Sequence, residues 1–119
     1  AFFRDAANNS HKNPTIFLIK KYIGQNYMNE TLSVKDISAH VFLSASYVCT
    51  FFKNETGQTL NQYITEYRME KAKQLLQDSR YKISDISSRV GYSDGNYFGK
   101  SFKKYSGLSP SEYREKNLQ

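Results

Sequence analysis

Hydrophobic residues recur at helical spacing along most of the chain. The clearest stretch runs from Thr59 to Gln77 and contains no Gly or Pro. Its apolar residues follow steps of three and four positions, the period of one helical face, and they are Leu60, Tyr63, Ile64, Tyr67, Ala72, Leu75 and Leu76. Thr59 and Gln62 form a capping-box pattern, which predicts where this helix begins. A helix of this length is about 27 Å long.

Shorter helical patterns lie on both sides of this central segment. A first helix is expected from Thr15 to about residues 26–29, and Ser33 with Asp36 forms a capping pattern for a short second helix. Ser44 can cap a third helix, which Gly57 would end. Beyond the central segment, helices are expected over residues 83–90, 94–105 and 109–117. No stretch shows the sustained alternation of a β-strand, so the sequence predicts an all-α fold with seven helices.

The segments before and after the central helix are near copies of each other. Residues 34–41 align with residues 83–90, and the offset from Ile37 to Ile86 is 49 residues. With one extra residue in the following turn the alignment continues, and its matched pairs are Tyr47 with Tyr97, Phe52 with Phe102, Lys53 with Lys103, Gly57 with Gly107 and Tyr63 with Tyr113. Each copy has a short helix, a tight turn and a longer helix, which is the layout of a helix-turn-helix.

This repeat predicts the domain organisation. Residues 1–14 are expected to be a linker or a flexible N-terminal end, and residues 15–117 to form one domain. Within that domain the helix-turn-helix units cover about residues 33–57 and 83–106, the connecting helix covers 59–77, and the final helix covers 109–117.

Charge and cysteine content narrow the function classes. Seventeen Lys and Arg against eleven Asp and Glu give a net charge of +6, which favours a polyanion such as nucleic acid as partner. The single Cys49 has no partner for an internal disulfide, and with His11 and His40 it lacks metal-ligand spacing. No apolar run approaches the roughly 20 residues of a membrane span. We therefore expect a cytoplasmic protein with no metal, no cofactor and no membrane contact.

The sequence resembles the AraC/XylS-type bacterial transcription regulators over nearly all of residues 16–114. In the second unit the matching residues are Ile86, Val90, Gly91, Tyr92, Ser93, Asp94, Tyr97, Phe98, Phe102, Lys103, Lys104, Gly107, Ser109, Pro110, Ser111, Glu112, Tyr113 and Arg114. Elsewhere they are Phe52, Lys53, Glu55, Thr56, Gly57, Tyr63, Ile64, Arg68, Ala72, Leu75 and Leu76. The resemblance implies that each unit presents a recognition helix to successive major grooves of duplex DNA. One turn of B-DNA is roughly 34 Å, so a connecting helix of about 27 Å is of the right order.

Helical periodicity and the family register together predict the contact residues. Tyr47, Val48, Phe51 and Phe52 are expected in the core of the first unit, and Phe98 and Phe102 in that of the second. The base-facing candidates are Ser46, Cys49, Thr50, Gly95, Asn96, Gly99 and Lys100. The phosphate-facing candidates are Ser44, Lys53, Tyr97, Lys103, Lys104 and Arg114, with Arg68 and Arg80 as weaker ones. Asn96 suits adenine and Lys100 suits guanine, whereas the first unit would read through hydroxyls and thymine methyl groups.

Structural alternatives stand beside these assignments. The lysines can form a solvated helix face, Arg68 can pair with an acidic side chain near Glu66 or Glu70, and Tyr97 can belong to the core. Cys49 is better explained as an exposed small residue than as an oxidation sensor. Asp36 and its repeat partner Asp85 are expected to be helix-capping residues and not a catalytic pair.

The chain contains no arrangement of residues that predicts catalysis. Residues 91–95 lack the following glycine and the preceding strand of a dinucleotide site. The expected function is sequence-specific binding of double-stranded DNA by a bacterial transcription regulator that also contacts RNA polymerase. The alternative is a helical protein-interaction module that docks the transcription machinery. The family resemblance implies an upstream sensing or receiver domain, and Tyr22, Ile23, Tyr27 and residues 43–47 look more like the response-regulator branch.

Overall fold

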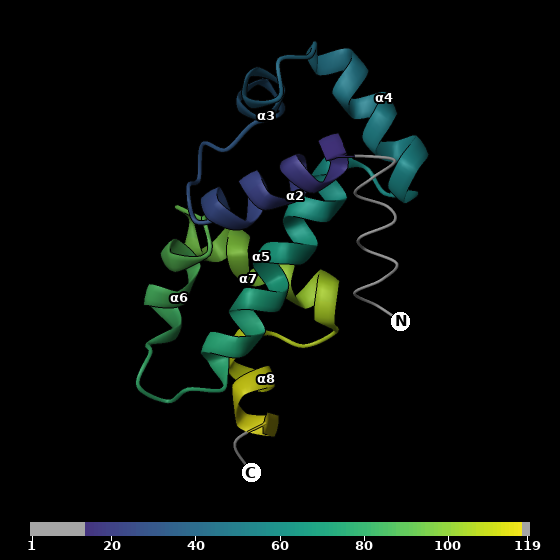
Figure 1. Cartoon of the computed structure of the whole chain (residues 1–119). Coiled ribbons are helices and arrows are strands. Elements are labelled where there is room, and N and C mark those ends of the chain that lie inside the picture. The colour runs from purple at the N-terminus through teal and green to yellow at the C-terminus, as the bar shows by residue number, and fades with distance from the viewer. Residues whose placement is uncertain (1–13, 118–119) are drawn as a thin grey trace. The chain divides into compact units, whose positions relative to one another are not determined.

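The structure is a computed structural model and describes residues 14–117. Over these residues it contains seven helices and no strand, which confirms the predicted all-α fold (Figure 1). The helices are α2 (Pro14–Asn26), α3 (Val34–His40), α4 (Ala45–Thr56), α5 (Leu60–Leu76), α6 (Ile83–Arg89), α7 (Gly95–Ser106) and α8 (Pro110–Asn117). Of the predicted linker, residues 1–13 lie outside the described part, whereas Pro14 begins α2, a position that tolerates proline.

The chain divides into two compact units, and the boundary falls inside α5. The described part of the first unit consists of residues 14–26 and Leu32–Tyr63, so it contains α2, α3, α4 and the start of α5. The described part of the second unit consists of Tyr27–Thr31 and residues 64–117, so it contains the rest of α5 with α6, α7 and α8. Each unit therefore holds one of the two predicted helix-turn-helix pairs.

Each unit has its own apolar core. In the first unit every helix contributes buried side chains, which are Ile19, Ile23, Ile37, Val48, Phe52 and Leu60. In the second unit one cluster contains Met69, Ala72, Leu76, Ile86, Val90, Tyr92, Phe98 and Phe102. These buried positions follow the helical spacing expected from the sequence, and burial of such side chains supplies about 1.5–3 kcal/mol each. The cores fix how α4 and α7 are presented.

The two copies of the repeat share the same local hydrogen bonds. Gly57 and Gly107 end α4 and α7 in the left-handed region, with φ of 79° and 87°. Each of these glycine N–H groups donates to the carbonyl four residues earlier at 2.8 Å. The next helix then starts with a capping box in both copies, Thr59 with Gln62 and Ser109 with Glu112. The sequence repeat is thus a repeat of structure.

An aromatic pair recurs in the two units as well. Phe52 packs edge-on against Tyr63 at 5.6 Å, and Phe102 packs edge-on against Tyr113 at 5.4 Å. Edge-to-face pairs at this distance are a favoured aromatic geometry. This contact joins α4 to α5 in the first unit and α7 to α8 in the second.

The extra residue of the second copy lies in its tight turn. The N–H of Leu43 donates to the carbonyl of Ser38, and the N–H of Tyr92 donates to that of Ser87, so the two turns start alike. The helix that follows is capped by Ser44 in the first unit and by Asp94 in the second. The second turn is therefore one residue longer.

Each tight turn also contains a residue with positive φ. In the first unit this residue is Phe42 at 60°, with its side chain 92% exposed, and in the second it is Gly91 at 96°. A Cβ atom at Gly91 would lie 2.4 Å from the carbonyl oxygen of Tyr27 and 2.9 Å from Nε of Arg68. The second turn therefore needs glycine for space as well as for backbone conformation, whereas the first turn has no such neighbour around its exposed phenylalanine.

The predicted capping role is confirmed for Asp36 and wrong for Asp85. Asp36 completes a capping box with Ser33, because the Ser33 hydroxyl accepts from the Asp36 N–H and the Asp36 carboxylate accepts from the Ser33 N–H. In the second unit the N-cap is Lys82, whose side chain has no acceptor, and α6 has no side-chain cap hydrogen bond. Asp85 remains in the first turn of α6, where a negative charge is favourable only through the helix dipole.

Candidate nucleic-acid interface

Helix α4 is held so that its leading end faces solvent. The Ser44 hydroxyl accepts a hydrogen bond from the N–H of Tyr47 at 3.1 Å, which caps the helix as predicted. Val48 and Phe52 are fully buried on the opposite face. The candidates on the outward face are all exposed, and they are Ser44, Ser46, Cys49, Thr50 and Lys53.

Tyr47 does not lie in the core, so its predicted burial is wrong. Its side chain is 53% exposed, and its ring stacks on that of Phe51 with centroids 5.6 Å apart and planes at 10°. Phe51 itself is only half-buried. The reason is that Val48 and Phe52 already fill the narrow face that α4 buries, and residue 47 lies about 100° away from residue 48 around the helix.

Helix α7 is capped differently from α4 but presents the same face. One carboxylate oxygen of Asp94 accepts from the N–H groups of Asn96 at 2.9 Å and Tyr97 at 3.3 Å. Phe98 and Phe102 are buried, as predicted. The candidates on the outward face are exposed apart from the half-buried Gly99, and they are Gly95, Asn96, Tyr97, Gly99, Lys100, Lys103 and Lys104.

Tyr97 is a surface residue, so the alternative that placed it in the core is wrong. Its side chain is 64% exposed and its ring lies 5.8 Å from that of Tyr92. Tyr92 takes the buried position instead, and burial raises the pKa of its hydroxyl above the ordinary value. The sequence could not separate these two tyrosines, because both lie near the start of α7.

Glycine at two positions of α7 has no internal packing reason. A Cβ atom at Gly99 would meet nothing within 4 Å, and one at Gly95 would meet only the hydroxyl of Ser87 at 3.9 Å. Glycine inside a helix costs roughly 0.8–1 kcal/mol relative to alanine. The outward face of α7 therefore presents bare backbone at Gly95 and Gly99, next to Asn96 and Lys100.

The three lysines of α7 leave their charges available. Among residues 14–117, Lys73 pairs with Glu70 and Arg80 pairs with Asp78. Lys100, Lys103 and Lys104 take part in neither and are exposed. In the first unit Lys53 is less free, because its Nζ lies 3.4 Å from the carbonyl oxygen of Gly57.

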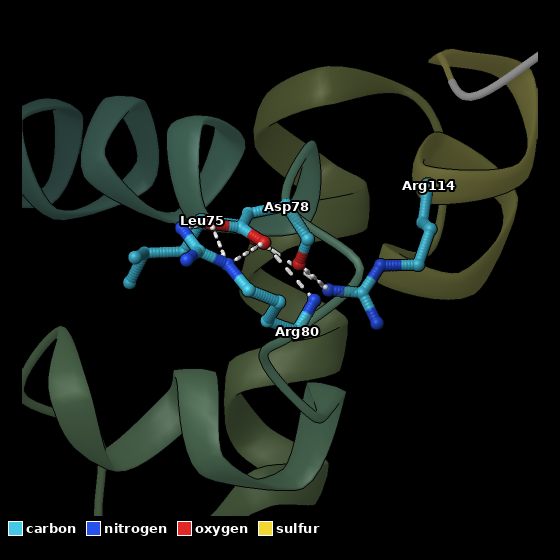
Figure 2. Close-up of polar contacts among 4 residues, drawn as sticks. All are labelled: Leu75, Asp78, Arg80 and Arg114. Atoms are coloured by element: carbon cyan, nitrogen blue, oxygen red, sulfur yellow. Dashed lines mark hydrogen bonds and ion pairs between the residues drawn. The ribbon is translucent and has the colours of Figure 1, made fainter.

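The arginine candidates are engaged within the second unit. Nε of Arg114 donates to the carbonyl of Leu76 at 2.8 Å. Its Nη2 donates to the carbonyls of Leu75 and Asp78 (Figure 2). The Leu76 carbonyl is one of the acceptors that the C-terminus of α5 leaves without an intrahelical donor. The carbonyls of Leu75 and Asp78 also accept from the N–H groups of Asp78 and Tyr81. Arg114 thus has a capping role, and its phosphate contact stays a prediction.

Arg80 lies beside Arg114 but binds a carboxylate. Its Nη2 is 2.7 Å from Oδ2 of Asp78 (Figure 2). The hydrogen bonds from Arg80 lower the pKa of Asp78 to about 2, and the same pair raises the pKa of Arg80. Arg80 is 85% exposed, so this pair is a surface interaction that salt can screen.

Arg68 forms hydrogen bonds with the segment between α2 and α3. Its Nε donates to the carbonyl of Tyr27 at 2.9 Å and its Nη2 to that of Asn29 at 2.9 Å. The guanidinium also lies over the ring of Tyr92, 5.6 Å from its centroid. These partners are backbone carbonyls and an aromatic face, not the acidic side chain that the sequence suggested.

No metal centre or membrane-spanning helix emerges from the part of the chain that the structure describes. Over residues 14–117, no three His, Cys, Asp or Glu side chains are grouped so that they could bind a metal ion. In the same range no helix combines the length and apolar character needed to cross a bilayer.

Comparison with known proteins matches this architecture. Residues 37–116 match the family model described as a helix-turn-helix domain. The raffinose operon transcriptional regulatory protein RafR of Pediococcus pentosaceus is 38% identical over 112 residues, which cover 93% of this chain and 40% of that protein. The chain spans about two fifths of the length of the curated relatives it matches.

Solved structures agree over most of the chain. The C-terminal domain of AraT, a response regulator from Geobacillus stearothermophilus, is 31% identical with a TM-score of 0.86, covering 89% of this chain and 88% of that one. A Chromobacterium violaceum transcriptional regulator, described by its AraC-type DNA-binding domain, is 28% identical with a TM-score of 0.82, covering 93% and 98%.

Proposed function

Because the chain belongs to the AraC-type helix-turn-helix domains of bacterial transcription regulators, we propose that it binds double-stranded DNA sequence-specifically through α4 and α7. The observation that carries the proposal is the outward face of α7. Three lysines without ion-pair partners in the described chain follow an exposed Asn96 and the bare backbone of Gly95 and Gly99. Lysines bind phosphates, and asparagine suits adenine.

The two recognition helices have different parts in this proposal. On α7, Asn96 and Lys100 read bases, while Gly95 and Gly99 let the helix backbone approach the groove. Lys103, Lys104 and Tyr97 contact phosphates. On α4, Ser46, Cys49 and Thr50 read bases through hydroxyls and apolar contact, with Ser44 and Lys53 near phosphates. Base contacts specify the sequence and phosphate contacts position the protein.

Helix α5 sets the spacing of the two contacts along DNA in this proposal. It contains 17 residues without a break, so it is about 26 Å long. One turn of B-DNA is roughly 34 Å. A helix of this length, extended by the flanking turns, suits two successive major grooves.

Salt-dependent binding to duplexes selected from a random library tests the proposal. Lys100→Ala should reduce the preference for the selected sequence, whereas Lys103→Ala should weaken binding to all duplexes and reduce the salt slope by about 1. Lys21→Ala on α2, also exposed, is the matched control for loss of one charge. Binding that is insensitive to salt, or equal for every sequence, would contradict sequence-specific DNA binding.

The wider context of the domain is part of the same proposal. We propose that the domain lies in the cytoplasm, has no enzymatic activity, follows a sensing or receiver domain and contacts RNA polymerase. One solved relative is the C-terminal domain of a response regulator, which supports the part of this proposal that concerns a preceding receiver domain. Failure to shift random duplex DNA at low salt would favour the alternative, a protein-interaction module.

A further inference from the structure

The two recognition helices differ in charge. Helix α4 contains Lys53 and Glu55, whose charges cancel, whereas α7 contains Lys100, Lys103 and Lys104 and no acidic residue. Binding to a phosphate backbone draws on positive charge. If both helices contact DNA, α4 has to bind with less help from positive charge than α7.

The one lysine of α4 lies far from the leading end of the helix. Lys53 is nine residues after the cap residue Ser44, which is about 13 Å along the axis. Its Nζ is also within 3.4 Å of the Gly57 carbonyl oxygen at the C-terminal end. The first two turns of α4 therefore offer DNA only neutral hydrogen-bond donors.

Tyr47 is the largest exposed donor in these turns. Its hydroxyl forms no hydrogen bond with any other described residue, and its ring is held against Phe51 at 5.6 Å. Such stacking restricts the side chain before binding, so less conformational entropy is lost when a partner is contacted. The hydroxyl is thus positioned in advance and unsatisfied.

The second unit has an exposed tyrosine at the same position. Tyr97 is the repeat partner of Tyr47, and it is steadied by Tyr92 at 5.8 Å, a residue of the preceding turn. In the first unit the support comes from Phe51, one turn later in α4. The two units therefore hold a tyrosine at the front of the recognition helix by different aromatic contacts.

We propose that Tyr47 contacts DNA and donates its hydroxyl to a backbone phosphate. The first two turns of α4 then bind through neutral hydroxyl donors, while the lysines of α7 supply most of the salt-dependent attraction. This inference rests on the proposed DNA binding and adds to it a residue that the helical periodicity had placed in the core.

The test is Tyr47→Phe in the whole chain, measured as duplex affinity against salt concentration. Removing a neutral donor to a charged phosphate should weaken binding roughly tenfold. The loss should be the same on a selected duplex and on a scrambled one, and the salt slope should stay unchanged because no counterion is involved. Lys103→Ala should instead lower the slope by about 0.9.

Tyr22→Phe is the matched control. It also removes one tyrosine hydroxyl from the first unit, but on α2, where the ring of Tyr22 lies 4.4 Å from that of His40. Affinity should be that of the unchanged chain. Thermal unfolding of all variants checks that folding is intact, which is expected since the phenyl ring keeps its contacts.

Three results would overturn the inference. They are affinity of Tyr47→Phe within twofold of the unchanged chain, a loss confined to the selected duplex, and a lowered salt slope. The second result would indicate base reading instead of phosphate contact. If the unchanged chain binds no duplex, the proposed function itself fails and the inference falls with it, so the two failures are distinguishable.

Discussion

The replacement of Gly91 by alanine tests how the tight turn of the second unit is built. The new Cβ would lie 2.4 Å from the carbonyl oxygen of Tyr27 and 2.9 Å from Nε of Arg68. No side chain can fit there unless the hydrogen bond between Arg68 and Tyr27, 2.9 Å long, is displaced. The variant therefore combines two separate costs.

The magnitude follows from those two parts. A non-glycine residue at φ of 96° carries left-handed strain of about 1–2 kcal/mol. Loss of a hydrogen bond from a charged donor adds about 1.5–3 kcal/mol. We expect Gly91→Ala to lower the free energy of unfolding by about 2.5–5 kcal/mol, and to lower the urea midpoint by more than about 1 M.

Gly107→Ala is the control for strain alone. Gly107 also has a positive φ, 87°, but a Cβ there would meet nothing within 4 Å. Its replacement should cost only about 1–2 kcal/mol. In an Arg68→Ala background, Gly91→Ala should cost less than in the unchanged chain, because the same hydrogen bond cannot be lost twice.

Urea denaturation of the four variants measures these differences. If Gly91→Ala costs no more than Gly107→Ala, close approach at Gly91 does not contribute. If the costs of the Gly91 and Arg68 replacements simply add, the two residues do not share the hydrogen bond to Tyr27. Either result would refute the reasoning.

Three further predictions concern α5 and its C-terminal end. Arg114→Ala should lower the free energy of unfolding by about 2–3 kcal/mol, because it removes the charged donor to the Leu76 carbonyl at the end of α5. Folding lowers the pKa of Asp78 from 3.8 to about 2, so the stabilisation by its carboxylate is present above pH 3.8 and is lost as the pH falls towards 2. Asp78→Ala should therefore flatten the dependence of the free energy of unfolding on pH between these two values. Inserting four residues near Glu70 should add about 6 Å and rotate the second recognition helix by about 40° relative to the first, so specific DNA binding should be lost while both units keep their helices.

Each of these predictions has an outcome that contradicts it. For Arg114 the control is Arg80→Ala, since Arg80 is 85% exposed, and equal losses for the two arginines would argue against the capping role. For Asp78 the contrary result is an acid unfolding curve that the replacement leaves unchanged. For the insertion, a footprint of unaltered length and affinity would mean that α5 is only a connector, and circular dichroism shows whether the helices remain.

Local patterns predicted the helix ends well, because the groups that form them are close in sequence. The capping boxes of Ser33 with Asp36 and of Thr59 with Gln62 involve residues three apart. The glycine that ends α4 donates to a carbonyl four residues away. Where the pattern lacked an acceptor, at Lys82, the expected cap did not form.

The surface of the recognition helices was less predictable. Periodicity gives the angle of each residue around the helix but not the width of the face that the core covers. On α4 the core of the first unit buries only Val48 and Phe52. Tyr47, which lies beside this narrow face, is therefore exposed. An aromatic residue next to the buried stripe fits either environment, and only neighbouring elements decide between them.

The sequence by itself determined the seven helices of the described chain, most of their caps and the repeat of two helix-turn-helix units, since these depend on hydrogen bonds and apolar spacing within a few residues. The tertiary structure decided the roles of the arginines. Arg68 contacts Tyr27, 41 residues away, and Arg114 contacts Leu76, 38 residues away. A long flexible cation finds a carbonyl, a carboxylate or a phosphate according to what folding brings within reach, and no local pattern carries that information.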